Sequence, residues 1–489
     1  MLLKDVLKNI KVYETNGEID GVEITSLTLD NRKCVPGSAF FAIRGLVNDG
    51  HKYIGGAAEN GAAAVFVEEF TCDPVLQIKV ADTRSAMSLA AAAFYGDPAR
   101  RMHFIGVTGT NGKTSITFML RAALESLGVK VGMIGTSGIY AGEKKVEIPI
   151  STSTTPDPIE LQYILSVLAD MGTETVVMEV TAQALHLRKV EDIYFDAGIF
   201  TNLTQDHLEF FKTMEIYAQA KKKLFEASRC AVAVINTDDA LGAEIARDTD
   251  CLKVTYSVAG EADITAKNAA VHGMGCTFEL HMGSYTALAK LCVSGIFNVY
   301  NALGAFGALT AVGYEPQTAL RALECYHGTP GRFETPDMKG KPYSVVIDYA
   351  HTPDALENVL RTVRGFARGR VVTLFGCGGN RDKAKRPIMG EIAGRYSDFL
   401  IVTSDNPRNE EPMSIIESVV EGVNKSGCPH VVIEDRREAI KYALENAKEK
   451  DVIVLAGKGH ENYQEIGGGK RHFDEKEIVA ELLEELDRR

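Results

Sequence analysis

The sequence predicts an α/β protein with three domains, and this expectation rests on two strand–helix patterns and on the length. Short apolar strands alternate with amphipathic helices over residues 99–330 and again over 331–489, which is typical of mainly parallel sheets with helices on their faces. A block of mixed short strands and helices over 1–98 precedes them. The 489 residues also fit about three domains of roughly 100–200 residues each.

The composition excludes several classes of protein. Apolar residues make up 45% and charged residues 24% of the chain, the balance of a soluble globular protein. The net charge of −13 argues against nucleic-acid binding, which usually needs a basic face. The nine cysteines are odd in number and form no CxxC, as in reduced intracellular proteins. No signal-peptide pattern and no run of ~20 apolar residues is found, so we expect a cytoplasmic protein without a membrane span.

The N-terminal block, residues 1–98, predicts a small α/β domain. Its apolar strands are expected at 38–43, 62–69 and 76–81. An alanine-rich helix is expected over 84–96, where it ends in Gly-Asp-Pro.

The central block carries a glycine-rich loop between a strand and a helix. In "GVTGTNGKTS" (106–115), backbone N–H groups and the helix N-terminus can bind phosphate, Lys113 can reach the β- and γ-phosphates, and Thr114 can bind Mg²⁺. The strict phosphate-loop pattern has glycine in place of Val107, and a turn without function is the alternative. The context favours ATP, so we expect a P-loop ATPase-like domain. The predicted nucleotide-binding residues of the loop are Gly109, Thr110, Asn111, Gly112, Lys113, Thr114 and Ser115.

Other strands of the central block end in candidate metal ligands. Glu179 ends one apolar strand, and Asp206 and His207 follow another. Mg²⁺ prefers oxygen ligands, and a histidine can support such a site or can simply pack in the interior. Lys221 lies four residues after Tyr217 and therefore shares its face of a helix.

The loop "GTNGKTS" resembles the ATP-binding loop of the Mur ligase family of ATP-dependent amide ligases, and the similarity extends over nearly the whole chain. It implies that ATP binds with two Mg²⁺ ions, and that Lys221 is carbamylated by CO₂, which requires a neutral amine. The implied catalytic residues are Lys113, Lys221 and His207. The implied metal ligands are Thr114, Glu179, Lys221 and His207.

Further segments resemble nucleotide-binding parts of the family. Arg332 in "PGRFE" resembles a domain-hinge arginine that approaches the phosphates, and Asp348 in "IDYAHTPDALE" resembles a residue near the nucleotide. Asn298 in "GIFNVYNALGA" resembles a residue on the adenine and ribose side, although an asparagine before a helix could equally be its N-cap.

The same resemblance implies that residues 1–98 form a nucleotide-sugar domain for a UDP-muramoyl peptide. The residues that would hold this substrate are Leu29, Asn31, Ser153, Thr154, Thr155, Thr181 and Lys189. Some positions depart from the family pattern. Asn31 replaces a serine, "EVTAQ" (179–183) lacks a serine and a histidine, and Phe211 stands where a histidine is frequent. Lys189 takes the place of an arginine, with Arg188 beside it.

The C-terminal block, residues 331–489, predicts a Rossmann-like α/β domain with polar residues at the ends of its strands, where open parallel sheets bind ligands. Arg408 in "TSDNPRNEEP" (403–412) is either a solvated turn residue or a fork for a carboxylate. Its "DNPR" resembles the family's pocket for a diamino acid, in which Arg408 would grip a carboxylate and Asp405 or Glu461 would bind the ammonium. The implied pocket residues are Arg381, Asp405, Asn406, Pro407, Arg408, Gly457 and Glu461.

These segments resemble in particular the branch of the family that adds meso-2,6-diaminopimelate to UDP-N-acetylmuramoyl-L-alanyl-D-glutamate. An acyl phosphate made from ATP, followed by attack of the diaminopimelate amine, is therefore the expected reaction. Three alternatives stay open: the same ligation with L-lysine or another diamino acid, a folylpolyglutamate synthetase-like ligase, and a nucleotide-binding regulator without ligase activity. We expect a monomer that binds no nucleic acid.

Overall fold

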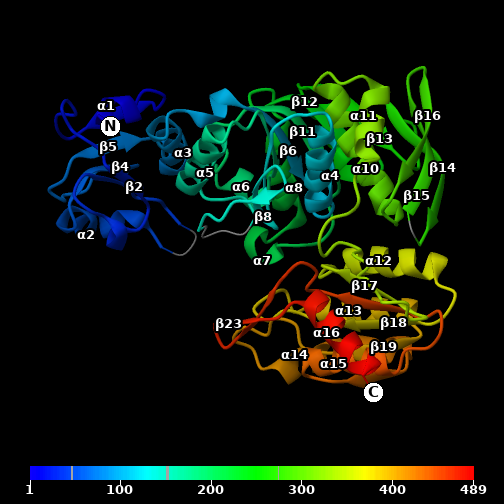
Figure 1. Cartoon of the computed structure of the whole chain (residues 1–489). Helices are drawn as coiled ribbons and strands as arrows, with labels where there is room; N and C mark the ends of the chain where they lie inside the picture. The colour runs from blue at the N-terminus through cyan, green and yellow to red at the C-terminus, as the bar shows by residue number, and fades with distance from the viewer. Residues whose placement is uncertain (46–47, 150–153, 274, 489) are drawn as a thin grey trace.

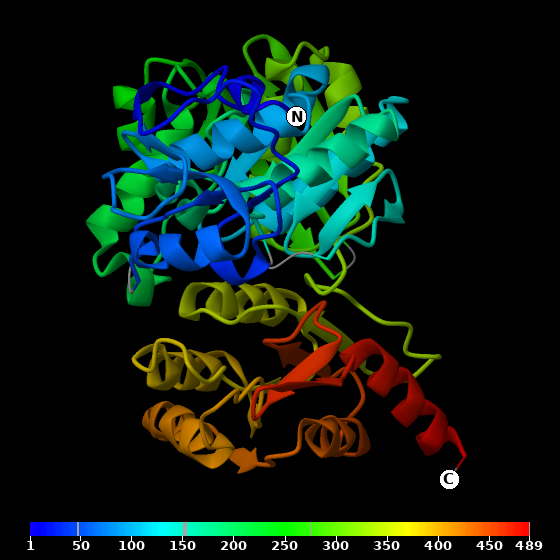
Figure 2. The same ribbon diagram turned by 90° about the vertical axis from the view of Figure 1, so that its left-hand side faces the viewer.

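The computed structural model describes residues 1–45, 48–149, 154–273 and 275–488, and the chain folds into three successive parts with one main sheet each (Figure 1). The N-terminal part, in blue, lies beside the central part, and the C-terminal part, in yellow to red, lies on another side of the central part. Figure 2 shows the C-terminal part set apart from the other two. The predicted α/β fold of three domains is therefore confirmed, while the boundaries at 98/99 and 330/331 stay predictions.

The N-terminal sheet has the order β1-β5-β4-β3-β2 and is parallel except between β1 and β5. Its elements are α1 (Leu3–Val6), β1 (Val12–Thr15), β2 (Ser26–Thr28), β3 (Ser38–Phe41), α2 (Ile54–Glu59), β4 (Ala62–Val67), β5 (Gln77–Val80) and α3 (Thr83–Phe94). The three predicted strands and the alanine-rich helix are confirmed. Helix α3 begins after Asp82 because that carboxylate accepts hydrogen bonds from the N–H groups of Arg84 and Ser85.

The central sheet has, in the described residues, eleven strands in the order β16-β15-β14-β13-β12-β11-β6-β10-β7-β8-β9. Strands β14 through β7 in this order are parallel, and antiparallel strands extend both edges. The bounds are β6 (His103–Thr108), β7 (Val131–Gly135), β8 (Gly138–Ala141), β9 (Lys144–Lys145), β10 (Thr175–Glu179), β11 (Phe195–Phe200), β12 (Cys230–Asn236), β13 (Leu252–Ser257), β14 (Ile264–His272), β15 (Gly275–Met282) and β16 (Tyr285–Leu291). Helices on both faces bury the middle strands, which explains their continuous apolar sequences.

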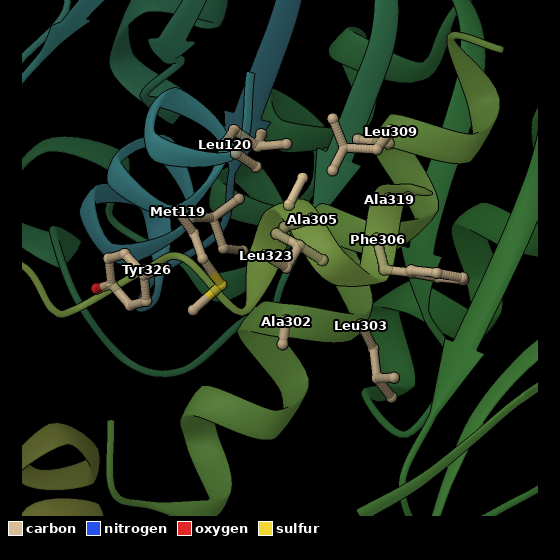
Figure 3. Close-up of a cluster of buried hydrophobic side chains, with 14 of the residues drawn as sticks. Met119, Leu120, Ala302, Leu303, Ala305, Phe306, Leu309, Ala319, Leu323 and Tyr326 are labelled. Atoms are coloured by element: carbon tan, nitrogen blue, oxygen red, sulfur yellow. The ribbon is translucent and has the colours of Figure 1, made fainter. Parts of the chain in front are cut away.

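The central helices are α4 (Lys113–Ser126), α5 (Pro158–Asp170), α6 (Ala182–His186), α7 (Leu208–Phe211), α8 (Met214–Lys222), α9 (Ala240–Asp248), α10 (Ile296–Ala311) and α11 (Pro316–Leu323). Figure 3 shows Met119 of α4, Leu303 of α10 and Leu323 of α11 in one buried cluster. Burying a side chain of this size contributes about 1.5–3 kcal/mol. The cluster therefore fixes α4, and with it the loop that precedes α4, against the sheet.

The C-terminal sheet is entirely parallel, in the order β17-β21-β18-β19-β20, and a hairpin of β22 and β23 lies outside it. The strands are β17 (Ser344–Asp348), β18 (Val371–Phe375), β19 (Phe399–Val402), β20 (His430–Val432), β21 (Val452–Ala456), β22 (Tyr463–Ile466) and β23 (Gly469–His472). The helices are α12 (Pro353–Phe366), α13 (Lys385–Tyr396), α14 (Pro412–Ser426), α15 (Arg436–Glu445) and α16 (Glu475–Asp487). Across the described residues, no helix has the length and apolarity to cross a membrane.

Helices α13 and α14 approach each other at glycines, which predicts an effect of a single methyl group. A Cβ at Gly422 would lie 1.8 Å from the carbonyl oxygen of Pro387, so Gly422→Ala pushes the helices apart. We expect a loss of about 1–3 kcal/mol of unfolding free energy, measured by urea denaturation. Gly365→Ala in α12 is the control, because its Cβ meets no atom within 4 Å and alanine favours helix. Equal urea midpoints for Gly422→Ala and the unaltered protein would contradict this close packing.

Candidate active site

A cavity of about 570 Å³ lies between the central and C-terminal parts. Its walls are formed by residues at the carboxyl ends of parallel strands from both sheets, where open α/β sheets bind ligands. The predicted site residues that line it are Thr110, Asn111, Gly112, Lys113, Thr114, Ser115, Thr154, Glu179, Thr181, His207, Arg332, Asp348, Arg381, Asp405, Asn406, Arg408, Gly457 and Glu461. Among the described residues, the predicted ones outside its wall are Leu29, Asn31, Gly109, Thr155, Lys189, Lys221, Asn298 and Pro407. Ser153 lies outside the described residues.

The glycine-rich loop is short, because β6 continues to Thr108, beyond the apolar stretch 103–105 from which the strand was predicted. Val107 is therefore a fully buried strand residue, which explains why glycine is not needed there. The turn itself requires glycine: Gly109 has φ +150°, and a Cβ on it would lie 1.8 Å from Thr201 Oγ1. Gly112, with φ +89°, precedes the first residue of α4. This strand–loop–helix geometry is that of a phosphate-binding loop.

Lys113 folds back over this loop. Its Nζ donates to the carbonyl oxygens of Gly109 and Thr110, both at 2.9 Å. Burial lowers the pKa of Lys113, although the carboxylates of Glu179 and Asp206 oppose that shift. The lysine is thus held at the cavity wall, at the N-terminus of α4.

Glu179 gathers hydroxyl and amide donors at the end of β10. Its Oε1 accepts from Thr114 Oγ1 and from the Thr136 N–H, both at 2.9 Å, and its Oε2 accepts from Thr136 Oγ1 at 3.1 Å. Arg332 Nη2 also donates to Thr114 Oγ1, at 3.4 Å. The predicted carboxylate and hydroxyl therefore touch each other. Thr136 was missed by sequence reasoning, since it follows β7 without any motif.

Thr155 and Lys189 lie behind this wall, next to Thr181, which lines the cavity. Thr155 Oγ1 donates to the Glu179 carbonyl oxygen and accepts from the Thr181 N–H. Lys189 Nζ donates to the Thr155 carbonyl oxygen at 3.4 Å and pairs with Asp157 at 2.7 Å. Thr154 Oγ1, by contrast, lies at the cavity and shares a hydrogen bond with Thr136.

Arg188 forms ion pairs away from Thr155. Its guanidinium pairs with Asp82 of the N-terminal part at 3.0 Å and with Glu191 at 2.9 Å. Of the neighbouring cations Arg188 and Lys189, it is therefore Lys189 that contacts Thr155.

Lys221 is buried in α8, with 1% of its surface exposed, and its Nζ lies 4.4 Å from the centre of the Tyr217 ring. The predicted shared helix face is confirmed. Burial lowers the pKa of Lys221 well below its usual range, and repulsion from Lys113 acts in the same direction. Both effects favour the neutral amine, the state that reacts with CO₂. The ring of Phe211 packs on Tyr217, with the two ring centres 5.0 Å apart.

His207 lines the cavity between two carboxylates. Its Nε2 lies 3.4 Å from Asp206 Oδ2 and its Nδ1 lies 3.6 Å from Glu209 Oε1. Burial alone would raise the pKa of Asp206, but His207, His351 and Lys385 together hold it below its usual value. His207 is thus an exposed member of an acidic cluster and not a packed core residue.

The asparagines of α10 have different positions. Asn301 lines the cavity, whereas Asn298 lies behind it and donates to the Ser294 carbonyl oxygen at 2.8 Å. The capping alternative for Asn298 is wrong, because Gly295 is the N-cap of α10 and Asn298 is its third residue. Asn301 Nδ2 donates to Asn298 Oδ1, so Asn298 orients the amide of the asparagine that lines the cavity.

Contacts across the cavity join the two parts. Asn111 Nδ2 of the phosphate loop donates to Asp354 Oδ2 of α12 at 2.7 Å. Arg332, in the connecting segment, stacks on Tyr349 with its guanidinium carbon 4.5 Å from the ring centre. Burial raises the pKa of Asp348, which accepts from the Phe333 N–H, while Arg332 opposes the shift. Asp354 and Tyr349 were missed, because only the folded chain brings them to the phosphate loop.

Arg408 is not a solvated turn residue: its side chain is 21% exposed. The Nη1 donates to the Gly379 carbonyl oxygen at 2.8 Å, and the Nε lies 3.2 Å from Glu465 Oε2. Its backbone has φ +54°, a strained value that pairing with Ile466 of β22 maintains. No motif in the sequence indicated that Glu465 would pair with Arg408.

Asp405, Asn406 and Glu461 lie beside Arg408. Asn406 Nδ2 donates to Glu461 Oε2 at 2.8 Å. Gly457 has φ +118°, and a Cβ there would lie 2.8 Å from Asp405 Oδ2, which explains the glycine. Arg381 lines the same end of the cavity and is exposed.

Leu29 and Asn31 belong to the N-terminal part. Leu29 is 47% exposed, and Asn31 begins a short 3₁₀ helix whose N-cap is Asp30. Neither residue lines the cavity, so their predicted role in substrate binding stays a prediction.

Comparison with known proteins identifies the family. Sequence models of the Mur ligase family match residues 23–95 (catalytic domain), 107–309 (middle domain) and 331–459 (glutamate ligase domain). A protein of Clostridium tetani, named UDP-N-acetylmuramoyl-L-alanyl-D-glutamate–2,6-diaminopimelate ligase, is 43% identical over 99% of this chain and 100% of its own. The chain belongs to the Mur ligase family. It is therefore an ATP-dependent ligase, as its phosphate loop indicates.

Two further comparisons agree with this family. A protein of Clostridioides difficile with the same name is 44% identical over 99% of this chain and 100% of its own. A solved structure of a ligase with that name superimposes with a TM-score of 0.71 at 31% identity, covering 100% of this chain and 99% of the other.

His351 predicts how stability depends on pH. Burial lowers the pKa of His351 to about 4, and Lys385 adds repulsion, whereas an unfolded histidine has a pKa of about 6.5. The unfolded chain binds the extra proton between these values. Stability therefore falls as the pH drops through this interval, by up to about 1.4 kcal/mol per pH unit for such a group.

His351→Gln should lose less stability than the unaltered protein between about pH 6.5 and about pH 4 in urea denaturation. His272→Gln is the control for the substitution itself, because the His272 side chain is exposed. Equal slopes for His351→Gln and the unaltered protein would show that His351 is not buried in the neutral form.

Proposed function

We propose that this ligase joins meso-2,6-diaminopimelate to UDP-N-acetylmuramoyl-L-alanyl-D-glutamate, with ATP, in the synthesis of peptidoglycan precursors. The observation that carries the proposal is the single cavity that holds both the phosphate loop and the pocket around Arg408. Relatives that align over the whole chain bear the name of this activity. A cytoplasmic location agrees with nine cysteines that form no disulfide.

In the first step, the side-chain carboxylate of the D-glutamate attacks the γ-phosphorus of ATP, giving an acyl phosphate and ADP. Positioning and charge neutralisation are what such a transfer needs from a protein. Lys113 and the loop N–H groups supply positive charge at the N-terminus of α4. Arg332 adds a guanidinium whose Nε is buried without a hydrogen-bond partner in the described residues, which suits a phosphate oxygen.

Magnesium fits one group of these residues as they stand. Thr114 and Glu179 offer the oxygen ligands that Mg²⁺ prefers, while phosphate and water complete such sites. For a second ion, His207 and Lys221 offer nitrogen, and only a carbamate on Lys221 would offer oxygen. Burial lowers the pKa of Lys221, which favours the neutral amine and so supports that modification. Bound Mg²⁺ would neutralise charge on the transferring phosphoryl group.

In the second step, the amine of diaminopimelate attacks the acyl carbonyl, the amide forms, and phosphate leaves. Arg408 would bind the carboxylate of the distal amino–carboxylate centre, and Asp405 or Glu461 its ammonium. The contacts Asn111–Asp354 and Arg332–Thr114 bring both parts together, which would exclude water from the acyl phosphate.

The other substrate would extend from this cavity to the N-terminal part. Leu29 and Asn31 would hold its uridine end, and Thr154, Thr155, Thr181 and Lys189 its peptide end together with Ser153. Asn298 would act on the adenine side through Asn301, whose amide it orients. We also propose that the protein is a monomer.

The acceptor amino acid separates this proposal from its rivals. L-lysine lacks the second carboxylate and would give Arg408 no substrate carboxylate to bind. Neither a folylpolyglutamate synthetase-like ligase nor a regulator without ligase activity would need the Arg408 pocket. Phosphate release with ATP, Mg²⁺ and the UDP-muramoyl dipeptide should require diaminopimelate and should not occur with L-lysine. Release with L-lysine alone would contradict the role of Arg408, and release with neither would contradict the ligase.

Arg408→Lys tests the fork. A lysine keeps the charge but cannot bind a carboxylate through two parallel N–H groups, so we expect the KM for diaminopimelate to rise about 10–100-fold. Arg395→Lys in α13 is the control, since Arg395 is 58% exposed and pairs with Glu391. An unchanged KM in Arg408→Lys would exclude a two-point contact.

Glu179→Gln tests the proposed metal site. A neutral amide is a weaker ligand, so we expect half-maximal activity to need about 10–100-fold more Mg²⁺. Glu174→Gln is the control, because Glu174 is exposed just before the same strand. Magnesium titrations of phosphate release that coincide for Glu179→Gln and the unaltered protein would exclude Glu179 as a ligand.

A further inference from the structure

A buried lysine lies behind the pocket that contains Arg408. Lys458 follows β21 and is 0% exposed. Its Nζ donates to Asn406 Oδ1 at 3.1 Å and to Glu461 Oε2 at 3.2 Å, and it lies 3.6 Å from Asp405 Oδ1. One ammonium therefore contacts three of the side chains proposed to receive the amino acid, although Lys458 does not itself line the cavity.

Lys458 fixes the orientation of the Asn406 amide. Asn406 Oδ1 accepts from Lys458 Nζ and from the Glu465 N–H at 2.9 Å, so two donors hold the oxygen on that side. The amide nitrogen then faces Glu461, to whose Oε2 it donates. Without the lysine, this amide would lose one of the two donors that determine its orientation.

Lys458 also offsets negative charge where Asp405 and Glu461 face the pocket that Arg381 and Arg408 line as well. Asp405 and Glu461 both line the cavity, and among the residues that the structure describes Lys458 is the cation that contacts both. The two carboxylates and the one ammonium together carry one negative charge. Asp405 Oδ1 is buried and has no hydrogen-bond partner in the described residues, so it can accept a donor from a ligand. Because buried carboxylates without a cation are costly, removal of Lys458 should disorder this arrangement.

We propose that Lys458 is a positioning residue for the incoming amino acid. It orients Asn406 and balances one of two carboxylates, so that the pocket accepts a single ammonium group. The inference rests on the proposed function, because it names what prepares the same pocket for its substrate.

The test compares Lys458→Met, which removes charge and donors, with Lys458→Gln, which keeps a donor without the charge. We expect the KM for diaminopimelate to rise about 10–100-fold in Lys458→Met and by less in Lys458→Gln. The KM values for ATP and the UDP-muramoyl dipeptide, and the kcat, should stay within about threefold of the unaltered protein. Lys341→Met, which removes a lysine paired with Asp487, is the control and should change none of them.

The outcomes are distinguishable. A merely structural role would reduce the fraction of active protein, which lowers kcat and leaves KM unchanged, and this result would overturn the inference. An unchanged diaminopimelate KM in both Lys458 variants would overturn it as well, while the proposed function would stand. Absence of diaminopimelate-dependent turnover in the unaltered protein would overturn the proposed function and this inference with it.

Discussion

The arrangement of the site depends on Arg332, which joins the two parallel sheets across one cavity. Its guanidinium donates to Thr114 at the phosphate loop and stacks on Tyr349 of the C-terminal part. Asn111 and Asp354 form the second contact across the same gap. Because both sheets present the carboxyl ends of their strands to this gap, a nucleotide bound at one sheet and an amino acid bound at the other would share one enclosed space.

Buried contacts behind the cavity support the loops at its Arg408 end. Arg436 is fully buried and donates to the carbonyl oxygens of Ser404 and Ala456, at the ends of β19 and β21, while its Nε pairs with Glu475. The Gln464 side chain donates to the Asp405 carbonyl oxygen, which attaches β22 to the same loop. Groups that recognise a ligand are effective when such supporting contacts hold them in place.

Sequence reasoning found most of the fold and the chemical groups, but not their supports. The phosphate loop could be predicted because backbone sterics demand glycine at Gly109 and Gly112, and Glu179 because a carboxylate ending an apolar strand is costly without use. Thr136 and Lys458 lie in no motif, and their contacts exist only after distant segments meet. The resemblance implied that Asn298 and Asn301 lie on the adenine and ribose side; in the structure Asn301 lines the cavity and Asn298 lies behind it.

In the proposed reaction the glutamate carboxylate is activated as an acyl phosphate in this shared cavity. The most direct measurement uses UDP-muramoyl dipeptide labelled with ¹⁸O in the side-chain carboxylate of its D-glutamate, with mass analysis of the released phosphate. We expect the released phosphate to carry one ¹⁸O atom, because one carboxylate oxygen leaves with the phosphoryl group when the amide forms. Phosphate without ¹⁸O, released together with amide product, would contradict it.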